Sequence, residues 1–154
     1  MWWRLRRKEV MASWGEGNHR AMREIVESGS VPGILAYLEG EPVGWISVEP
    51  RDEFPTLDRS RVLARVDDQP VWSIVCFFVD KRFRGKGLSV ELIRAAVNHA
   101  GERGAKIIEA YPVEPEKMIS APWAWTGLAS AFARAGFKEV ARRSRKRPIM
   151  RYYI

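Results

Sequence analysis

A short basic segment carries the pattern in this chain that is best suited to binding a charged ligand. Residues 82–87 read Arg-Phe-Arg-Gly-Lys-Gly, directly after an apolar stretch and directly before a run with helical periodicity. Gly85 and Gly87 allow unusual backbone angles and a close approach of the chain to a ligand. The amides from Arg84 to Ser89 can then converge on a phosphate at a helix N-terminus, whose dipole favours negative charge. The segment therefore predicts a site for a phosphorylated cofactor.

Two common phosphate-binding patterns fit this segment poorly. The Walker A string GxxxxGK[ST] does not occur in the sequence. The dinucleotide pattern GxGxxG is met by Gly85 and Gly87, but Val90 stands at its third position. Glu109 lies about where a ribose-binding acid would be expected, roughly 20 residues further on. Because the preceding strand lies mid-chain and after a predicted hairpin, dinucleotide binding is kept only as a weaker alternative.

A better match is the motif (Q/R)-x-x-G-x-(G/A), which residues 82–87 satisfy. In this context the sequence resembles the GNAT family of acetyl-CoA-dependent N-acetyltransferases. The apolar run 71–79 is similar to the family's fourth strand, and residues 105–113 are similar to its fifth. Residues 131–137, AFARAGF, resemble the helix that ends in Gly-Phe before the last hairpin. Together these segments cover most of residues 34–154 in the family's order.

The resemblance implies that acetyl-CoA is the cosubstrate. It places the pyrophosphate at residues 84–89 and the pantetheine arm against the main chain of residues 77–79. In the family, this arm lies in a splay between the fourth and fifth strands. The cofactor-binding residues expected on this basis are Phe77, Phe78, Val79, Arg84, Gly85, Lys86, Gly87, Leu88 and Ser89.

The catalytic groups are less clearly marked. Many family members place a tyrosine four residues before the glycine of Gly-Phe, where it protonates the leaving thiolate, but here that position is Phe132. Glu109 and Tyr111 have matching parity on a predicted strand and should face the same way, near the splay. We predict that Tyr111 protonates the thiolate and that Glu109 deprotonates the amine through water. The alternative is that the tyrosine packs its ring and that the glutamate is solvated or paired.

The acceptor is not identified by the sequence. Trp123 and Trp125 lie in a region that often walls the acceptor site in this family, although they can equally close the core. We expect a small-molecule or peptide amine. A non-catalytic acetyl-CoA-binding sensor remains an alternative because the usual tyrosine is missing.

These groups must be positioned by an α+β fold. Helical periodicity is expected within residues 7–29, a hairpin about residues 39–42, and strands at 71–79 and 105–113. A helix from residue 88, a helix over 125–135 and two C-terminal strands complete the pattern. With the resemblance, this predicts an acyl-CoA N-acyltransferase-like fold: a mixed, mostly antiparallel sheet, a central splay between two parallel strands, and helices on both faces.

Residues 1–154 are expected to form a single acetyltransferase domain. The family's first strand is matched only by Trp2-Trp3-Arg4-Leu5. We therefore expect that this strand is missing or shortened, or that the tryptophan pair packs against the core.

Composition excludes several classes of protein. Cys76 is the only cysteine and there are two histidines, so we expect no disulfide and no metal site. No apolar stretch approaches the ~20 residues of a membrane span, and a reducing cytoplasm is the expected location. If the protein oligomerises, we expect a homodimer.

The excess of basic residues points to anionic partners. The sequence has 26 basic and 19 acidic residues and a net charge of +7. Six of the basic residues cluster near the C-terminus, which makes a basic nucleic-acid-binding module a further alternative. No recognition motif accompanies the cluster, so we expect no specific nucleic-acid role. The six residues of the basic cluster are Arg142, Arg143, Arg145, Lys146, Arg147 and Arg151.

Overall fold

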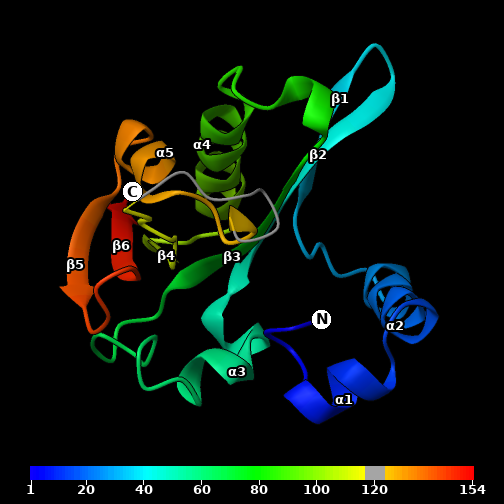
Figure 1. The fold of residues 1–154 in the computed structure, drawn as a ribbon, viewed down its shortest axis with the longest axis horizontal. Helices are drawn as coiled ribbons and strands as arrows, with labels where there is room; N and C mark the ends of the chain where they lie inside the picture. Colours follow the sequence, from blue (N-terminus) through cyan, green and yellow to red (C-terminus); the bar gives the residue numbers. More distant parts are fainter. Residues whose placement is uncertain (117–123) are drawn as a thin grey trace.

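The computed structural model describes residues 1–116 and 124–154 of the chain (Figure 1). Within these residues, six strands form one mixed sheet in the order β1-β2-β3-β4-β6-β5. The strands are β1 (Ile34–Leu38), β2 (Glu41–Pro50), β3 (Trp72–Val79), β4 (Ile107–Ala110), β5 (Lys138–Arg142) and β6 (Pro148–Tyr153). Every neighbouring pair is antiparallel except β3 with β4. The predicted fold class is confirmed.

The β1–β2 hairpin follows from its turn residues. Glu39 and Gly40 connect the strands, and both have positive φ, 50° and 83°. Two consecutive positive φ values match the twist of a two-residue hairpin turn. The expected hairpin is therefore confirmed, and it extends away from the rest of the sheet in Figure 1.

The two central strands separate where the cofactor arm was expected. β3 and β4 pair at Trp72 with Ile108, Ser73 with Glu109, and Ile74 with Ala110. Beyond that point β4 ends, while β3 continues to Val79 along β2. Main-chain groups of the second half of β3 thus lack a strand neighbour on the β4 side, and this gap is the predicted splay.

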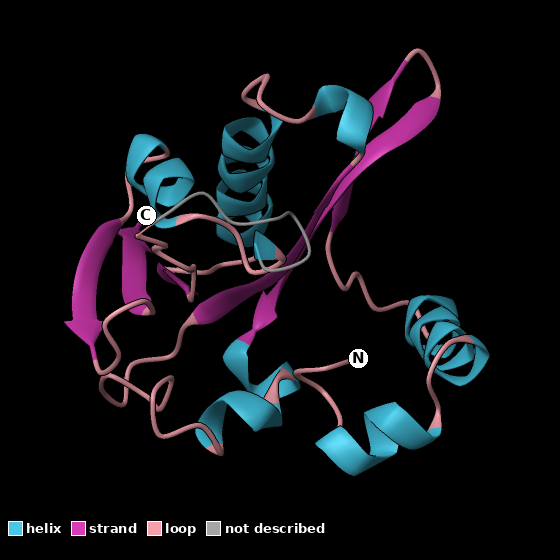
Figure 2. Cartoon of the chain, viewed as in Figure 1, coloured by secondary structure: helices cyan, strands magenta, loops and turns pink. Residues whose placement is uncertain are grey.

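Helices cover both faces of the sheet (Figure 2). One face packs on α4 and α5 around Ile74, Ile93 and Phe132. The opposite face packs on the N-terminal segment and on the region of α3, and it includes Trp3 and Tyr111. The helices are α1 (Arg7–Ala12), α2 (Glu16–Glu27), α3 (Pro55–Asp58), α4 (Leu88–Glu102) and α5 (Ala129–Arg134), with short 3₁₀ turns η1 (Arg51–Glu53) and η2 (Lys81–Phe83).

Helix α5 is shorter than the sequence pattern predicts. Residues 125 and 126 lie in a turn and Leu128 forms a bridge with Val113, so the helix begins at Ala129. Gly127 has a φ of 83°, which a right-handed helix does not allow. The main-chain carbonyl of Trp125 also accepts a hydrogen bond from the Phe77 amide at 2.7 Å. Contact with β3 therefore competes successfully with local helix formation.

The first 33 residues contain helices and no strand. Trp3 is buried, and its indole Nε1 donates to the Val75 carbonyl at 3.0 Å. Trp2 is more exposed. One residue of the tryptophan pair therefore packs against the core, at a carbonyl that the splay leaves without a strand partner. In the described part of the chain, no helix combines the length and the apolar character required to cross a membrane.

Candidate active site and cofactor groove

A groove of about 670 Å³ opens at the splay. It lies between the C-terminal half of β3, the basic turn, the N-terminus of α4, the turn before α5, and α5 itself. Its volume is in the range typical of small-molecule sites. The lining residues described by the structure are Phe77, Phe78, Val79, Phe83, Arg84, Gly85, Gly87, Leu88, Ser89, Ala124, Trp125, Gly127, Leu128, Ala131 and Arg134.

The basic turn is held in place by its own side chains. The Asp80 carboxylate accepts the backbone N–H of Arg82 at 2.8 Å and its Nε at 3.1 Å. Arg82 holds the pKa of this carboxyl below its usual range. Arg84 Nε donates to the Val79 carbonyl at 2.9 Å. These contacts fix the path of the chain between β3 and α4.

Glycine is required at two positions of this turn. Gly85 and Gly87 have φ values of 74° and 86°, which side-chain-bearing residues rarely adopt. A Cβ atom at either position would meet no other atom within 4 Å. The space above these glycines is therefore open, so a ligand can approach the backbone closely.

The amides around these glycines have no acceptor in the described part of the chain. Val90 and Glu91 donate to the Gly87 carbonyl at 2.9 and 3.4 Å, as expected for a first helical turn. The N–H groups of residues 84–89 donate to no acceptor among the residues that the structure describes. They stand at the N-terminus of α4, a helix of 15 residues. An array of free amides at a helix N-terminus is suited to an anion such as a pyrophosphate.

The residues predicted to bind the cofactor gather at this groove. All of them line it except Lys86, whose Nζ lies 5.5 Å from the centre of the Phe83 ring. Sequence reasoning did not name the far wall, which Ala131 and Arg134 of α5 and the turn at Gly127 provide. The sequence predicted a helix in residues 125–135, but it did not indicate which face of that helix meets β3. The binding roles themselves stay predictions.

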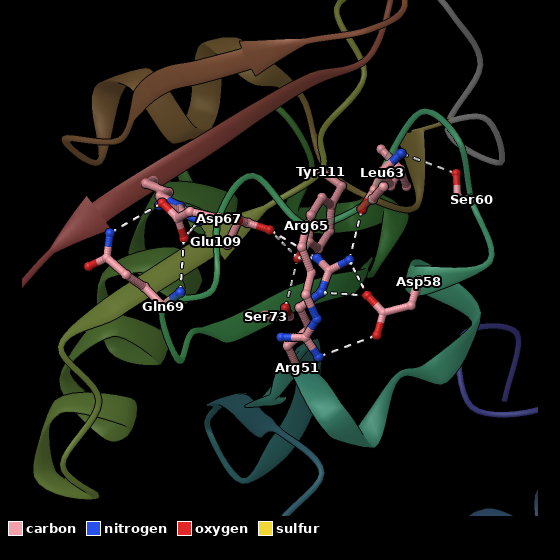
Figure 3. Close-up of polar contacts among 12 residues, drawn as sticks. Arg51, Asp58, Ser60, Leu63, Arg65, Asp67, Gln69, Ser73, Glu109 and Tyr111 are labelled. Atoms are coloured by element: carbon pink, nitrogen blue, oxygen red, sulfur yellow. Dashed lines mark hydrogen bonds and ion pairs between the residues drawn. The ribbon is translucent and has the colours of Figure 1, made fainter.

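The predicted catalytic pair lies elsewhere, in a buried polar network (Figure 3). Tyr111 is fully buried, and its hydroxyl donates to Glu109 Oε1 at 2.7 Å. The same hydroxyl accepts Arg51 Nη1 at 2.5 Å and lies 2.9 Å from Ser73 Oγ. Burial, and then the charge of Glu109, raise the pKa of Tyr111 well above its usual value of 10. The phenol is therefore held in its neutral form.

Glu109 stands between two buried arginines. Its Oε1 accepts Arg51 Nη1 at 3.0 Å, and its Oε2 accepts Arg151 Nε at 2.8 Å. Arg51 also donates to Asp58, and Arg151 also donates to Asp67. Sheet register explains the assembly, because Glu109 pairs with Ser73 on one side and with Arg151 on the other. Neither arginine was singled out as a partner from sequence, because strand register brings Arg151 to Glu109 and the packing of the turn after β2 brings Arg51 there.

Tyr111 and Glu109 do share one face near the splay, as expected. However, neither lines the groove, and their polar atoms are already engaged within the protein. These contacts favour a structural role for the pair, and the predicted catalytic role is the alternative that a variant can test.

The variant Tyr111→Phe separates the two roles. It removes a hydroxyl that contacts Ser73, Arg51 and Glu109, so we expect the free energy of unfolding to fall by about 1–3 kcal/mol. Turnover per folded molecule should change little. Urea denaturation and kcat measured on the same samples test this expectation. A loss of about 10²–10⁴-fold in kcat with unchanged acetyl-CoA affinity would instead establish Tyr111 as the general acid.

Phe132 forms part of the wall behind the groove. Its ring is fully buried, 5.7 Å from the ring of Phe77 and 5.1 Å from that of Phe137. No tyrosine, histidine, cysteine or acidic side chain lines the described part of the groove. The described walls therefore supply no conventional general acid.

Two tryptophans lie at the splay on the side opposite α4. Trp3 and Trp125 stack with ring centres 5.6 Å apart. Trp125 also lines the groove, and it packs against the hydrophobic cluster on the opposite face of the sheet. Trp123 lies outside the described residues.

The C-terminal arginines make contacts within the protein. Arg142 pairs with Glu139 and Glu114, and Arg145 pairs with Glu116. Arg143 donates to the main-chain carbonyls of residues 64 and 65. The basic cluster thus has structural partners, and the expectation that it has no specific nucleic-acid role stays a prediction.

Comparisons with known proteins agree on one family. The model of the acetyltransferase (GNAT) family matches residues 1–121. A curated relative, an uncharacterized N-acetyltransferase of Methanocaldococcus jannaschii, is 26% identical over 106 residues. That match covers 69% of this chain but only 38% of the relative, so the chain spans well under half of the relative's length.

Solved structures show the same fold at low sequence identity. A ribosomal-protein-alanine N-acetyltransferase from Brucella melitensis has a TM-score of 0.57 and 19% identity, over 90% of this chain and 78% of that one. A putative GNAT acetyltransferase from Desulfovibrio desulfuricans gives 0.59 and 17%, over 94% and 88%. A chain of the NatC complex bound to Gag peptide and CoA gives 0.56 and 13%, over 88% and 79%. With the family model matching well over half of its residues, this chain belongs to the GNAT family of acetyltransferases.

Proposed function

We propose that this chain binds acetyl-CoA in the groove and transfers its acetyl group directly to a primary amine. The observation that carries the proposal is the set of unpaired amides of residues 84–89 at the mouth of a groove that runs along the unpaired half of β3. This arrangement offers a cradle for phosphate at one end and main-chain hydrogen bonds for an extended arm at the other. Acetyl-CoA has that shape and charge.

The groove offers contacts for the pyrophosphate and for the pantetheine arm of the cofactor. The pyrophosphate binds at the amides of residues 84–89, with Arg84 and Lys86 supplying positive charge. The pantetheine arm lies along residues 77–79, where strand alternation directs the Val79 amide away from β2. The Phe77 amide points the same way but is bonded to the Trp125 carbonyl. It can reach a thioester only after that hydrogen bond is exchanged.

Direct transfer requires no covalent enzyme intermediate. The neutral amine attacks the thioester carbon, a C–N bond forms, and the C–S bond to CoA breaks. The amine gives up one proton and the CoA thiolate takes up one. Phe132 has no proton that it can donate, and the described walls of the groove offer no other general acid. We therefore infer that solvent protonates the thiolate. Main-chain amides of β3 polarise the thioester carbonyl.

The proposal extends to the setting of the reaction. The 154 residues act as one acetyltransferase domain in the cytoplasm, on a small-molecule or peptide amine. A second candidate function is that of a non-catalytic acetyl-CoA sensor. The observation that favours it is the lack of a general acid in the described lining of the groove. A sensor and an enzyme share the binding step and differ in turnover.

Thermal unfolding with ligands tests the binding step. At 100 times its dissociation constant, a ligand adds about 2.7 kcal/mol of stability, which corresponds to a rise of about 5–10 °C in Tm for a chain of this size. We expect this shift with acetyl-CoA and with CoA, and not with ATP. Stabilisation by NADH and not by acetyl-CoA would contradict the proposal and favour the dinucleotide alternative. Acetylation of a broad amine panel then separates the enzyme from the sensor.

A further inference from the structure

Arg147 is a partly buried arginine without an acidic partner. In the described part of the chain, four arginine side chains are shielded from solvent to a comparable degree or more: Arg4, Arg51, Arg147 and Arg151. Arg4 pairs with Glu49, Arg51 with Asp58 and Glu109, and Arg151 with Glu109 and Asp67. By contrast, the Arg147 guanidinium makes one hydrogen bond within the described residues, from Nη1 to Thr126 Oγ1 at 3.3 Å.

No carboxylate outside the described residues can fill this role. Residues 117–123 read Lys-Met-Ile-Ser-Ala-Pro-Trp and contain no acidic side chain. Burial lowers the pKa of Arg147, and no opposing charge raises it. A shielded guanidinium without a counter-ion costs free energy, and that cost is removed when an anion binds. Among the described residues, each of the other three shielded arginines has a carboxylate partner and Arg147 has none.

Arg147 lies on the face of the sheet opposite α4, close to the turn that lines the groove. It directly precedes β6, and strand alternation places it on the face that carries Ile149 and Arg151, opposite α4 and α5. Its partner Thr126 is buried between Trp125 and Gly127, which both line the groove. Arg147 thus lies against the turn that contains Thr126, on the other face of the sheet from the phosphate cradle.

We infer that Arg147 binds the carboxylate of the acceptor, and that the acceptor is an amine that also carries a carboxyl group, such as an amino acid with an apolar side chain. This inference rests on the proposed function. An amine that reaches the thioester from the face opposite α4 passes the half-buried ring of Trp125, which lines the groove and offers an apolar surface to the rest of the acceptor. A guanidinium can hold a carboxylate through two parallel hydrogen bonds, which fixes the acceptor's orientation.

Matched pairs of amines test the inference. Phenylalanine is compared with 2-phenylethylamine, and leucine with 3-methylbutylamine, at saturating acetyl-CoA. We expect kcat/KM to favour the carboxylated member of each pair by about 10–100-fold, as charge-assisted hydrogen bonds of this kind allow. Arg147→Met should abolish the preference, and Arg147→Lys should retain part of it. Arg145→Met is the matched control, because Arg145 lies on the same turn with its side chain 85% exposed.

A binding measurement makes the test independent of turnover. On the CoA-loaded protein, N-acetylphenylalanine should bind more tightly than N-acetyl-2-phenylethylamine by calorimetry, and Arg147→Met should remove the difference. The same variant should have an unchanged or higher Tm, because it loses an uncompensated charge. Its acetyl-CoA affinity should equal that of the parent.

Four results would overturn the inference. The first is a carboxyl group that gives no advantage in turnover or in binding, and the second is an Arg145→Met variant that removes the advantage as completely as Arg147→Met. A weaker affinity of Arg147→Met for acetyl-CoA would assign the anion to the cofactor instead. If the parent bound no acetyl-CoA, the proposed function would fail together with this inference, whereas the first three results leave the proposed function intact.

Discussion

Replacing Gly87 with valine is expected to abolish acetyl-CoA binding while the chain still folds. Gly87 is the N-cap of α4 with a φ of 86°, and no atom lies within 4 Å of a Cβ placed there. A valine would both resist this backbone angle and fill the open space above the free amides. We expect the dissociation constant to rise more than 100-fold, and the acetyl-CoA shift in Tm to disappear.

Gly104→Val is the matched control for this variant. Gly104 also has a φ of 86°, and a Cβ there meets nothing within 4 Å, but it follows the C-terminal end of α4. Each substitution should therefore cost a similar amount of stability, about 1–3 kcal/mol, and only the one at Gly87 should affect the ligand. If the two variants bind acetyl-CoA equally well, the cofactor site has been placed wrongly.

The largest loss of stability is expected from Glu109→Gln. The glutamate is 1% exposed and stands between the guanidinium groups of Arg51 and Arg151. Its amide replacement keeps the size but removes the negative charge that both buried arginines share. Removing one partner from a buried ion pair typically costs about 3–5 kcal/mol. Because small domains are stable by only about 5–15 kcal/mol, a substantial unfolded fraction at 37 °C is the expected result.

Urea denaturation of this variant is compared with that of Glu139→Gln. Glu139 pairs with Arg142 at the surface, so the midpoint urea concentration of that control should barely move. Acetyl-CoA affinity, measured on the folded fraction, should be retained in both. A Glu109→Gln protein of normal stability with little remaining turnover would contradict the structural role and support Glu109 as the base for the amine.

The sequence alone was sufficient to predict those features whose structure is determined by residues close together in the chain. The basic turn could be predicted because Gly85 and Gly87 are needed for backbone angles that their neighbours in the chain impose. The hairpin at Glu39-Gly40 and the buried face of α4 follow in the same way from turn chemistry and from helical period. Eight of the nine predicted cofactor residues line the groove, because they occupy one continuous strand–turn–helix segment.

Tertiary structure decided which side chains are partners. Parity alone placed Glu109 and Tyr111 on one face, but the groups that engage them are distant in sequence. Arg51 is 58 residues from Glu109, and Arg151 is 42 residues away. The same holds for the turn at Trp125, whose carbonyl accepts a hydrogen bond from the Phe77 amide, so that the predicted helix begins only at Ala129. Pairs of this kind are fixed by strand register and by the packing of segments far apart in the chain, and local sequence patterns carry no information about either.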